Sequence, residues 1–453
     1  MTRVKPHATT TLVAALAFFS YSVLVRTDGI TTSFLLLGEQ TRDWTLALGN
    51  WWDLPLTGAP STAGGRGLGP AYYWVLWLGR QLVGPFSSNL PHGGGISIAL
   101  LQAIADTCLL VALMRWLPLA LALAAMLTIA TQPFEVGLSA AIWNPPVATA
   151  FAKLAMALML GLESSSPRWR VAATAAVAWL GVQAHASGVF VAAPILAAII
   201  LEPLLRRQWT RSSELLVGVV TVLFVLQIPY GVAMLRSPAD VGGPTVALAS
   251  FSDVSALDPG NSFTRVTSVA GWLISDDNDS WSFGWVMLAA LGLVVWRWPK
   301  EARVLAVTAG PIATATLLFA AWTRPYESYW FMTLATPAVI TCGFAVAALP
   351  WALARTAIAV ALLALVLLWQ PSRVADSKNF FRYPQYRALL EGSKAAARAA
   401  PTLRRLQAGF EVHETTDVSY MYRILGGRIT PDGPRDATIQ PDGTVTFTLA
   451  AQP

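Results

Sequence analysis

Long apolar runs, separated by short charged or Pro/Gly-rich turns, fill most of the first 370 residues of the chain. An α-helix needs about 20 such residues to cross the roughly 30 Å of hydrocarbon in a bilayer. Residues 69–84 are also apolar, but they are short, rich in Trp and Tyr and contain Arg80. We expect that segment to lie flat on the membrane surface, where aromatic rings are favoured. The remaining runs predict about eleven membrane-spanning helices, at 9–27, 96–114, 118–132, 145–162, 171–185, 188–203, 213–235, 283–298, 303–321, 329–348 and 351–369.

The Lys and Arg residues of the membrane part stand in short clusters between the apolar runs. Short loops that carry such clusters are retained on the cytoplasmic side of a membrane. If 69–84 does not cross, the loops at 28–95 and 236–282 and the tail from about residue 370 share the opposite, extracytoplasmic face. One orientation then places every basic cluster inside: Arg3 and Lys5, Arg115, Arg168 and Arg170, Arg206, Arg207 and Arg211, and Arg297, Lys300 and Arg303.

The composition indicates that lipid is the solvent for most of the chain. Hydrophobic residues make up 55% and charged residues 12%, whereas about 25% of an ordinary soluble domain is charged. The formal charge of +6 does not predict nucleic-acid binding, because the cations form no continuous basic face. The two cysteines and four histidines show no CxxC or HExxH spacing, so neither a redox motif nor a zinc motif is indicated.

The C-terminal tail, residues 371–453, has the composition of a soluble domain. Its pattern predicts an amphipathic helix around 383–400 and short strands such as 444–449, separated by Pro-Asp-Gly turns at 431–433 and 441–443. The predicted fold class is therefore an all-α polytopic membrane protein with a small C-terminal α/β domain on the extracytoplasmic side. The membrane domain would span residues 1–370, with surface helices in its first external loop at 28–95.

Two acids stand near the start of that first external loop. Glu39 and Asp43 are four residues apart, so on a helix they share one face, with Arg42 beside them. A carboxylate at this place can accept a proton from an attacking hydroxyl, and burial among Trp side chains raises its pKa toward a useful range. A helix cap with a local ion pair explains the same spacing equally well.

The first loop resembles that of the GT-C superfamily of polyprenyl-phosphate-sugar-dependent glycosyltransferases, the branch that includes protein O-mannosyltransferases and the lipid A aminoarabinose transferase. Members often have an Asp-Glu/Gln-x-Arg motif, which corresponds here to Glu-Gln-Thr-Arg at 39–42, and a Pro-Leu-Tyr-Tyr-Trp segment, which corresponds to Pro-Ala-Tyr-Tyr-Trp at 70–74. Glu39 stands where Asp is usual, and Ala71 where Leu is usual. The resemblance implies a GT-C-like fold and places Tyr72 and Tyr73 beside the substrate.

Three further residues on the extracytoplasmic side are candidates for lining the substrate. Asn144 precedes a Pro pair at the start of a span, and an N-cap role explains it as well. Glu135 is an acid in an apolar environment, where it needs a partner or a function. His185 interrupts an apolar hairpin and is suited to binding a lipid phosphate or orienting a carboxylate, although a structural hydrogen bond between helices is an equal alternative.

The turn at 322–330 (WTRPYESYW) contains our leading candidate for holding a donor phosphate, Arg324. An Arg side chain offers a planar fork to phosphate oxygens and stays charged in any protein environment. Arg42 is a second phosphate candidate, and Arg66 or Arg265 is suited to the same role. Tyr326 and Tyr329 would line the sugar or prenyl path. In the alternative interpretation the aromatic and basic side chains of this turn only anchor it at headgroup depth.

The favoured hypothesis is an inverting glycosyltransferase with a polyprenyl-phosphate sugar donor, a class that the resemblance implies. Glu39 or Asp43 would deprotonate an acceptor hydroxyl on a lipid, glycan or protein, at the extracytoplasmic face of a bacterial-type inner membrane. The absence of GxxxxGK[ST] and strand-borne GxGxxG motifs argues against direct nucleotide use. No cofactor or complete metal site is predicted, although the carboxylates are compatible with a divalent metal. The alternatives are a transporter or lipid-linked-sugar flippase, which Asp106 inside a span would favour, and a structural subunit.

Overall fold

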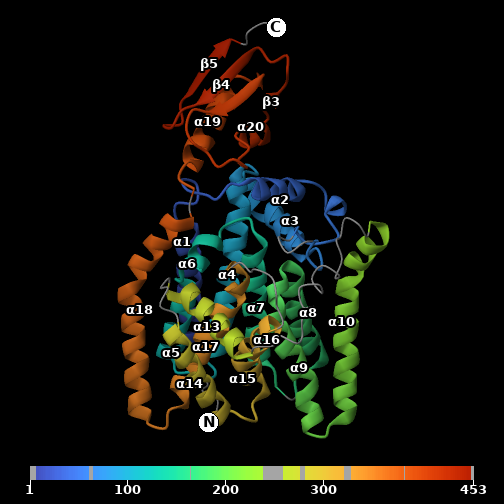
Figure 1. Ribbon diagram of the computed structural model, residues 1–453, viewed down its shortest axis with the longest axis vertical. Coiled ribbons are helices and arrows are strands. Elements are labelled where there is room, and N and C mark those ends of the chain that lie inside the picture. The colour runs from blue at the N-terminus through green and yellow to red at the C-terminus, as the bar shows by residue number, and fades with distance from the viewer. Residues whose placement is uncertain are drawn as a thin grey trace.

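The computed structural model describes residues 7–60, 65–163, 165–237, 259–275, 281–320, 328–381 and 383–449. A bundle of helices forms the larger part, and a small α/β domain lies at one end of it (Figure 1). Each of the eleven predicted runs is helical in its described part, and the run at 303–321 is broken at Thr308. The corresponding helices are α1 (Ala8–Thr27), α4 (Pro91–Leu113), α5 (Leu119–Ala130), α7 (Asn144–Gly161), α8 (Arg168–Ala184), α9 (Val189–Leu205), α10 (Trp209–Arg236), α14 (Trp281–Arg297), α15 (Ala302–Val307), α16 (Ala309–Ala320), α17 (Met332–Ala348) and α18 (Ala352–Phe381).

Several helices of the bundle have the length and the exposed apolar surface of membrane spans. Among the described residues, five stretches are long and apolar enough to cross a bilayer: α1, α4, α9 with the turn before it, α10 and most of α18. Helices α10 and α18 lie at the two sides of the bundle (Figure 1) and expose large apolar side chains such as Phe224 and Leu368. So much exposed apolar surface is stable only when lipid covers it. The chain is a polytopic helical membrane protein.

The interval 236–282, predicted to be an external loop, contains the helix α13 (Pro259–Ser275). This helix packs against α14, α16 and α17, and its Val266 and Ala270 are fully buried. The loop prediction is therefore wrong over these residues. Ser, Thr and Arg residues on the other faces of α13 lower its average hydropathy, which conceals the apolar stripe that the helical period places on one side.

Basic residues from distant parts of the sequence meet at the end of the bundle opposite the C-terminal domain. Arg303 donates to the carbonyl oxygen of Leu162, and its guanidinium lies 5.6 Å from the ring centroid of Trp116. Arg170 donates to the carbonyl oxygen of Gly161 at 3.1 Å. The turn between α9 and α10 lies at this same end (Figure 1). The prediction that the basic clusters share one end of the bundle is confirmed for those between Arg115 and Arg303, whereas Arg3 and Lys5 lie outside the described residues.

Short helices cover the end of the bundle that carries the C-terminal domain (Figure 1). Helix α3 has 13 residues, too few to cross the hydrocarbon core, and packs against α2, α4 and α8 with Leu76 buried and Leu82 exposed. The short elements are α2 (Gly38–Leu48), η1 (Trp51–Asp53), α3 (Ala71–Val83), η2 (Gly84–Ser87), α6 (Pro133–Leu138), η3 (Ala186–Gly188) and η5 (Ser328–Phe331).

The C-terminal domain has the predicted α/β character. Helix α18 continues through Pro371, so this domain begins later than the expected boundary at 370. Strand β2 pairs in parallel with β4, which pairs antiparallel with β5, and β1 pairs in parallel with β3. At the second Pro-Asp-Gly turn Gly443 has φ +84°, a conformation that glycine adopts without strain. The elements are α19 (Tyr386–Ala399), β1 (Thr402–Leu403), β2 (Arg405–Ala408), α20 (Tyr420–Ile424), β3 (Arg428–Ile429), β4 (Arg435–Ile439) and β5 (Val445–Leu449).

The C-terminal domain is bound by side-chain contacts to the segment between α1 and α4 and to the start of α4. Tyr386 of α19 hydrogen-bonds through its hydroxyl to Nδ1 of His92 at 2.8 Å. Thr45 of α2 donates to the hydroxyl of Tyr420 at 2.9 Å. One hydrophobic core joins the two parts, because Phe34 packs against the ring of Tyr386. The domain and the first loop therefore support each other directly above the bundle.

Candidate functional site

Helix α2 is fixed on the bundle by its own caps and by one buried Trp. The amide of Leu37 donates to Gln40 Oε1 at 3.0 Å, which satisfies a free group at the helix start. Trp44 is fully buried, and its indole N–H donates to the carbonyl oxygen of Asn89 at 2.7 Å. Only glycine fits at position 94, because a Cβ there would stand 2.7 Å from the Trp44 ring. These contacts fix helix α2 in place and therefore set the orientation of Asp43, the residue before Trp44.

Asp43 is held by three hydrogen-bond donors at the junction of α2 and α3. The Tyr72 hydroxyl donates to its Oδ2 at 3.1 Å, and the Tyr73 hydroxyl donates to its Oδ1 at 3.1 Å. Arg42 Nε donates to Oδ1 at 2.8 Å, and the Asp43 side chain is only 3% exposed. Three donors fix the orientation of the carboxylate. A carboxylate offers about four lone-pair positions, so Oδ2 retains room for one further hydroxyl.

The two tyrosines are suited to remain donors. Burial raises the pKa of Tyr72 well above its ordinary value, and the nearby charge of Asp43 adds to the rise. Burial and Asp43 also raise the pKa of Tyr73, while the positive charges of Arg42 and Arg66 oppose that rise. Both phenols therefore keep their protons throughout the ordinary pH range.

The structure separates the two candidate acids. Glu39 is exposed, and its Oε1 accepts from Gln40 Nε2 at 3.2 Å. It lies on α2 with Asp43, as predicted, but the hydroxyls of Tyr72 and Tyr73 point to Asp43. Asp43 is thus the acid that is both buried and preorganised.

A second turn brings Arg66 to this place. The Gly58 amide donates to the Gly67 carbonyl oxygen and the Gly67 amide donates to the Ala59 carbonyl oxygen, and Arg66 pairs with Pro60 in an isolated β-bridge. Gln227 of α10 holds the end of this turn by donating to the Leu68 carbonyl oxygen at 2.7 Å. Arg66 is half-buried and acts electrostatically on Tyr73. Arg42 therefore pairs with Asp43 itself, and Arg66 acts on Tyr73, which donates to the same carboxylate.

A second group of candidate residues gathers around Tyr329 of η5. The Tyr329 ring lies 4.5 Å from the Trp143 ring and 6.3 Å from the His185 ring. Asn144 donates to the Ala184 carbonyl oxygen at 3.3 Å and is the first residue of α7, so it is not the N-cap. Asn144, His185 and Tyr329 are thus brought together by α7, the end of α8 and η5.

His185 is a neutral side chain in this arrangement. Its Nδ1 accepts from the Ser187 amide at 3.3 Å and lies 2.8 Å from the Ser187 hydroxyl. Burial lowers the pKa of His185 to about 4. These hydrogen bonds stay within the turn that contains His185 and do not join two helices. A neutral imidazole does not supply charge to a phosphate. Arg324 and Tyr326, the other candidates of the late turn, lie outside the described residues.

The fold resembles that of solved membrane transferases. ArnT from Cupriavidus metallidurans bound to undecaprenyl phosphate aligns with a TM-score of 0.56 and 16% identity, over 92% of this chain and 85% of that chain. Apo ArnT from the same organism aligns with a TM-score of 0.54 and 15% identity over the same shares. This chain has the GT-C fold. The mycobacterial arabinofuranosyltransferase AftD aligns with a TM-score of 0.46 and 14% identity, over 95% of this chain and 32% of that chain. No protein-family model and no curated protein sequence matches the chain.

Within the GT-C bundle, Glu135 does not line an open site. It is fully buried on α6 and pairs with Lys153 at 2.8 Å and with Arg26 at 3.2 Å. Asp106 pairs with the same two cations, with Lys153 at 2.8 Å and with Arg26 at 2.7 Å. The prediction that Glu135 is a substrate-lining residue is therefore wrong, because two cations from α1 and α7 enclose its carboxylate. Ser22 and Gln102 complete this cluster with hydrogen bonds.

The partners in this buried cluster are the residues that sequence reasoning missed. Arg26 and Lys153 stand inside predicted spans, where an ionisable side chain needs a partner. Two cations and Asp106 within predicted spans, with Glu135 between two of the spans, are a detectable signal, although spacing alone does not pair them. Because Asp106 is fully paired, it gives the transporter hypothesis no support within the GT-C fold.

The described part of the chain contains no group of three or more His, Cys, Asp and Glu side chains placed to hold a metal ion. Participation of a divalent metal is therefore left as a prediction. By themselves, the described residues can accept a proton at Asp43 and stabilise negative charge through Arg42 and Arg66.

Proposed function

We propose that this protein is a membrane glycosyltransferase that transfers a sugar from a polyprenyl-phosphate donor to an acceptor hydroxyl, with inversion at the anomeric carbon. The observation that carries the proposal is the buried Asp43 carboxylate, fixed by Tyr72, Tyr73 and Arg42 at the head of a GT-C bundle. The likeness to ArnT, whose structure contains undecaprenyl phosphate, supports the donor class.

In the proposed reaction Asp43 acts as the general base. The acceptor hydroxyl occupies the remaining lone-pair position on Oδ2 and transfers its proton there as its oxygen attacks the anomeric carbon. The bond between that carbon and the lipid phosphate oxygen breaks on the opposite face, and the electron pair leaves with the phosphate. Attack from the opposite face inverts the configuration at the anomeric carbon.

The departing phosphate gains negative charge and needs cations beside it. Arg42 is suited to this role, because its side chain is 44% exposed while it pairs with Asp43. Arg324, in the turn between α16 and η5, remains a candidate for binding the donor phosphate. Glu39, exposed at the start of α2, is the alternative base.

The site lies at the end of the bundle that carries the C-terminal domain (Figure 1). A prenyl chain can remain between helices at this boundary while the sugar reaches water. The basic clusters at the opposite end support an extracytoplasmic location for the site and the domain, in a bacterial-type inner membrane. The acceptor, a lipid, glycan or protein, would enter between α2 and the C-terminal domain.

Transfer of radiolabelled sugar from a polyprenyl-phosphate donor by the purified protein tests the proposal. We expect Asp43→Asn to lower kcat by a factor of about 10²–10⁴, the usual contribution of a general base. Glu39→Gln should retain most activity, and Asp53→Asn is a matched control, because Asp53 is an exposed acid of the same loop. Equal activity of Asp43→Asn and wild type would refute the site, and intact donor with every acceptor class would favour a transporter or flippase.

The phosphate assignment is tested separately through the KM for the donor. Arg324→Gln and Arg42→Gln should each raise this KM about tenfold, the effect of one charge-assisted hydrogen bond. Arg236→Gln serves as the control, because Arg236 is exposed at the end of α10. A KM unchanged in Arg324→Gln would support the alternative in which that turn only anchors the protein at headgroup depth.

A further inference from the structure

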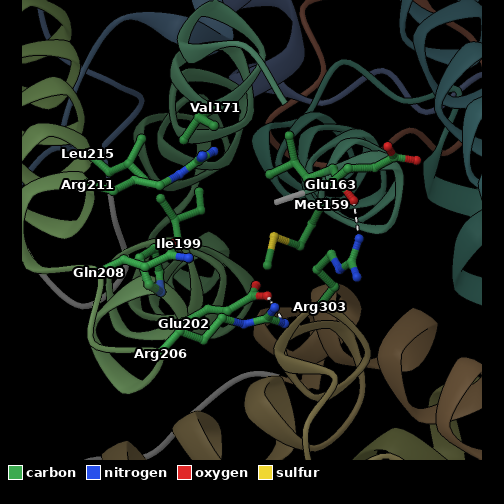
Figure 2. A pocket seen from close by; sticks show the side chains of 12 residues that line it. Met159, Glu163, Val171, Ile199, Glu202, Arg206, Gln208, Arg211, Leu215 and Arg303 are labelled. Atoms are coloured by element: carbon green, nitrogen blue, oxygen red, sulfur yellow. Dashed lines mark hydrogen bonds and ion pairs between the residues drawn. The ribbon is translucent and has the colours of Figure 1, made fainter. Parts of the chain in front are cut away.

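A cavity lies among α7, α8, α9, α10 and α15 (Figure 2). Helices α9 and α10 turn at the end of the bundle opposite the C-terminal domain (Figure 1), and the cavity lies beside this turn. Its volume is about 50 Å³, several times the roughly 10–15 Å³ that one water molecule needs. The proposed sugar transfer does not use it. Apolar side chains and three arginines line the cavity, and these two features together indicate its ligand.

The cations come from three separate elements. Arg206 ends α9, Arg211 stands in the first turns of α10, and Arg303 belongs to α15. Figure 2 shows the guanidinium of Arg211 directed toward Val171 and the interior of the cavity. The sequence brings these side chains together only through the fold, because Arg303 is far from the other two along the chain.

Of the three arginines that line the cavity, Arg211 is the one that no described acid neutralises. Arg206 is neutralised by Glu202, whose Oε1 lies 2.7 Å from its Nη2. Arg303 pairs with Glu301 at 3.1 Å, and the carboxylate of Glu163 points away from Arg211 (Figure 2). Among the described residues Arg211 has no hydrogen bond or ion pair, although it is half-buried. A half-buried guanidinium is stable when an anion satisfies its donors.

The apolar side chains of the cavity indicate that its anion carries an alkyl group. Met159, Val171, Ile199 and Leu215 line the interior and present methyl and methylene groups to it. A free inorganic anion gains nothing from such walls, whereas a phosphate ester with an alkyl portion buries that portion against them. Basic pockets between membrane helices, at the end of a bundle that carries its Lys and Arg clusters, are suited to binding lipid headgroups.

We propose that this cavity binds the phosphate of an anionic phospholipid, with Arg211 as the principal contact. The phosphate would accept hydrogen bonds from the Arg211 fork, and the adjoining glycerol and first methylenes would lie against the apolar walls. The site is independent of the sugar transfer proposed above, so the two proposals stand or fall separately.

Binding is measured with the full-length protein in nanodiscs of phosphatidylcholine that contain increasing fractions of phosphatidylglycerol, by native mass spectrometry of retained lipid and by the shift in Tm. Phosphatidylglycerol should be retained and should raise Tm. Arg211→Gln should weaken retention about tenfold, since it removes a charge-assisted hydrogen bond to the phosphate. Arg211→Lys, which keeps the charge but loses the fork, should fall between the two and guards against misfolding of the first variant.

The matched control is Arg207→Gln. Arg207 is exposed in the same turn, does not line the cavity and carries the same charge. Retention within twofold of wild type in this variant supports the cavity as the site. Equal losses in Arg207→Gln and Arg211→Gln would show only general attraction to an anionic surface and would overturn the proposal. Inorganic phosphate that reproduces the full rise in Tm without lipid would overturn the assignment to a lipid.

Discussion

The hydroxyl of Tyr72 lies 3.1 Å from Oδ2 of Asp43, with the acid on α2 and the phenol on α3. This hydrogen bond joins two helices that the loop at 49–70 separates in sequence. Oδ2 accepts this one hydrogen bond and keeps one further lone-pair position for a substrate hydroxyl. The pair therefore connects the packing of the first loop to the proposed chemistry.

Tyr72→Phe should lower kcat by a factor of about ten. The Tyr72 hydroxyl donates to Oδ2 of Asp43, the oxygen proposed to take the proton of the acceptor, and a hydrogen bond to a charged group contributes about 1.5–3 kcal/mol. Without this donor the carboxylate is free to turn away from the acceptor hydroxyl. Tyr73→Phe, which removes the donor to Oδ1, should act similarly. Sugar transfer by the purified variants measures the change, and a wild-type kcat in both would mean that these tyrosines serve only packing.

The buried cluster of Arg26, Asp106, Glu135 and Lys153 should dominate the stability of the bundle core. Lys153→Met leaves two carboxylates with one cation, which costs about 3–5 kcal/mol of unfolding free energy. Glu214→Gln removes one partner of the exposed pair with Arg168 and should cost less than about 1 kcal/mol. Thermal or denaturant unfolding in detergent measures both, and comparable losses would contradict the role given to the cluster.

The hydrogen bond between Tyr386 and His92 should hold the C-terminal domain on the first loop. Both side chains are buried, so Tyr386→Phe leaves the imidazole without this partner and should cost about 1–3 kcal/mol. Faster hydrogen exchange in α19 and the first turn of α4 would register the change. Tyr383→Phe is the control, because the Tyr383 hydroxyl accepts from the exposed His413 amide. Unaltered exchange in Tyr386→Phe would show that the apolar core alone docks the domain.

Acid should destabilise the hairpin at His185. Burial lowers the pKa of the folded protein's His185 to about 4, below the ordinary value of 6.5. Between these values the unfolded chain binds more protons, so this contribution is fully present above pH 6.5 and is lost as pH falls toward 4. We expect His185→Asn, whose side-chain oxygen can still accept from the Ser187 amide, to flatten the dependence of Tm on pH in this window. Parallel curves for variant and wild type would contradict the assignment.

The sequence by itself determined the bundle and its ends. Apolar length selects helices that cross lipid, and the positions of Lys and Arg along the chain are sufficient to place Arg170 and Arg303 at one end. The pattern of the tail was equally sufficient for α19 and β5, because the period of an amphipathic helix and the residues of tight turns are local properties. Helix α13 escaped prediction because its apolar stripe is narrow and its average hydropathy is low.

Only the tertiary structure decided which ionisable groups meet. Spacing made Glu39 and Asp43 equal candidates, and packing of α3 on α2 directed both tyrosine hydroxyls to Asp43. Glu135 looked like a site residue until α1 and α7 brought Arg26 and Lys153 to it. The reason is physical: burial and pairing depend on contacts between helices distant in sequence, and the free energy of a charge in a protein depends on those contacts far more than on its neighbours in the chain.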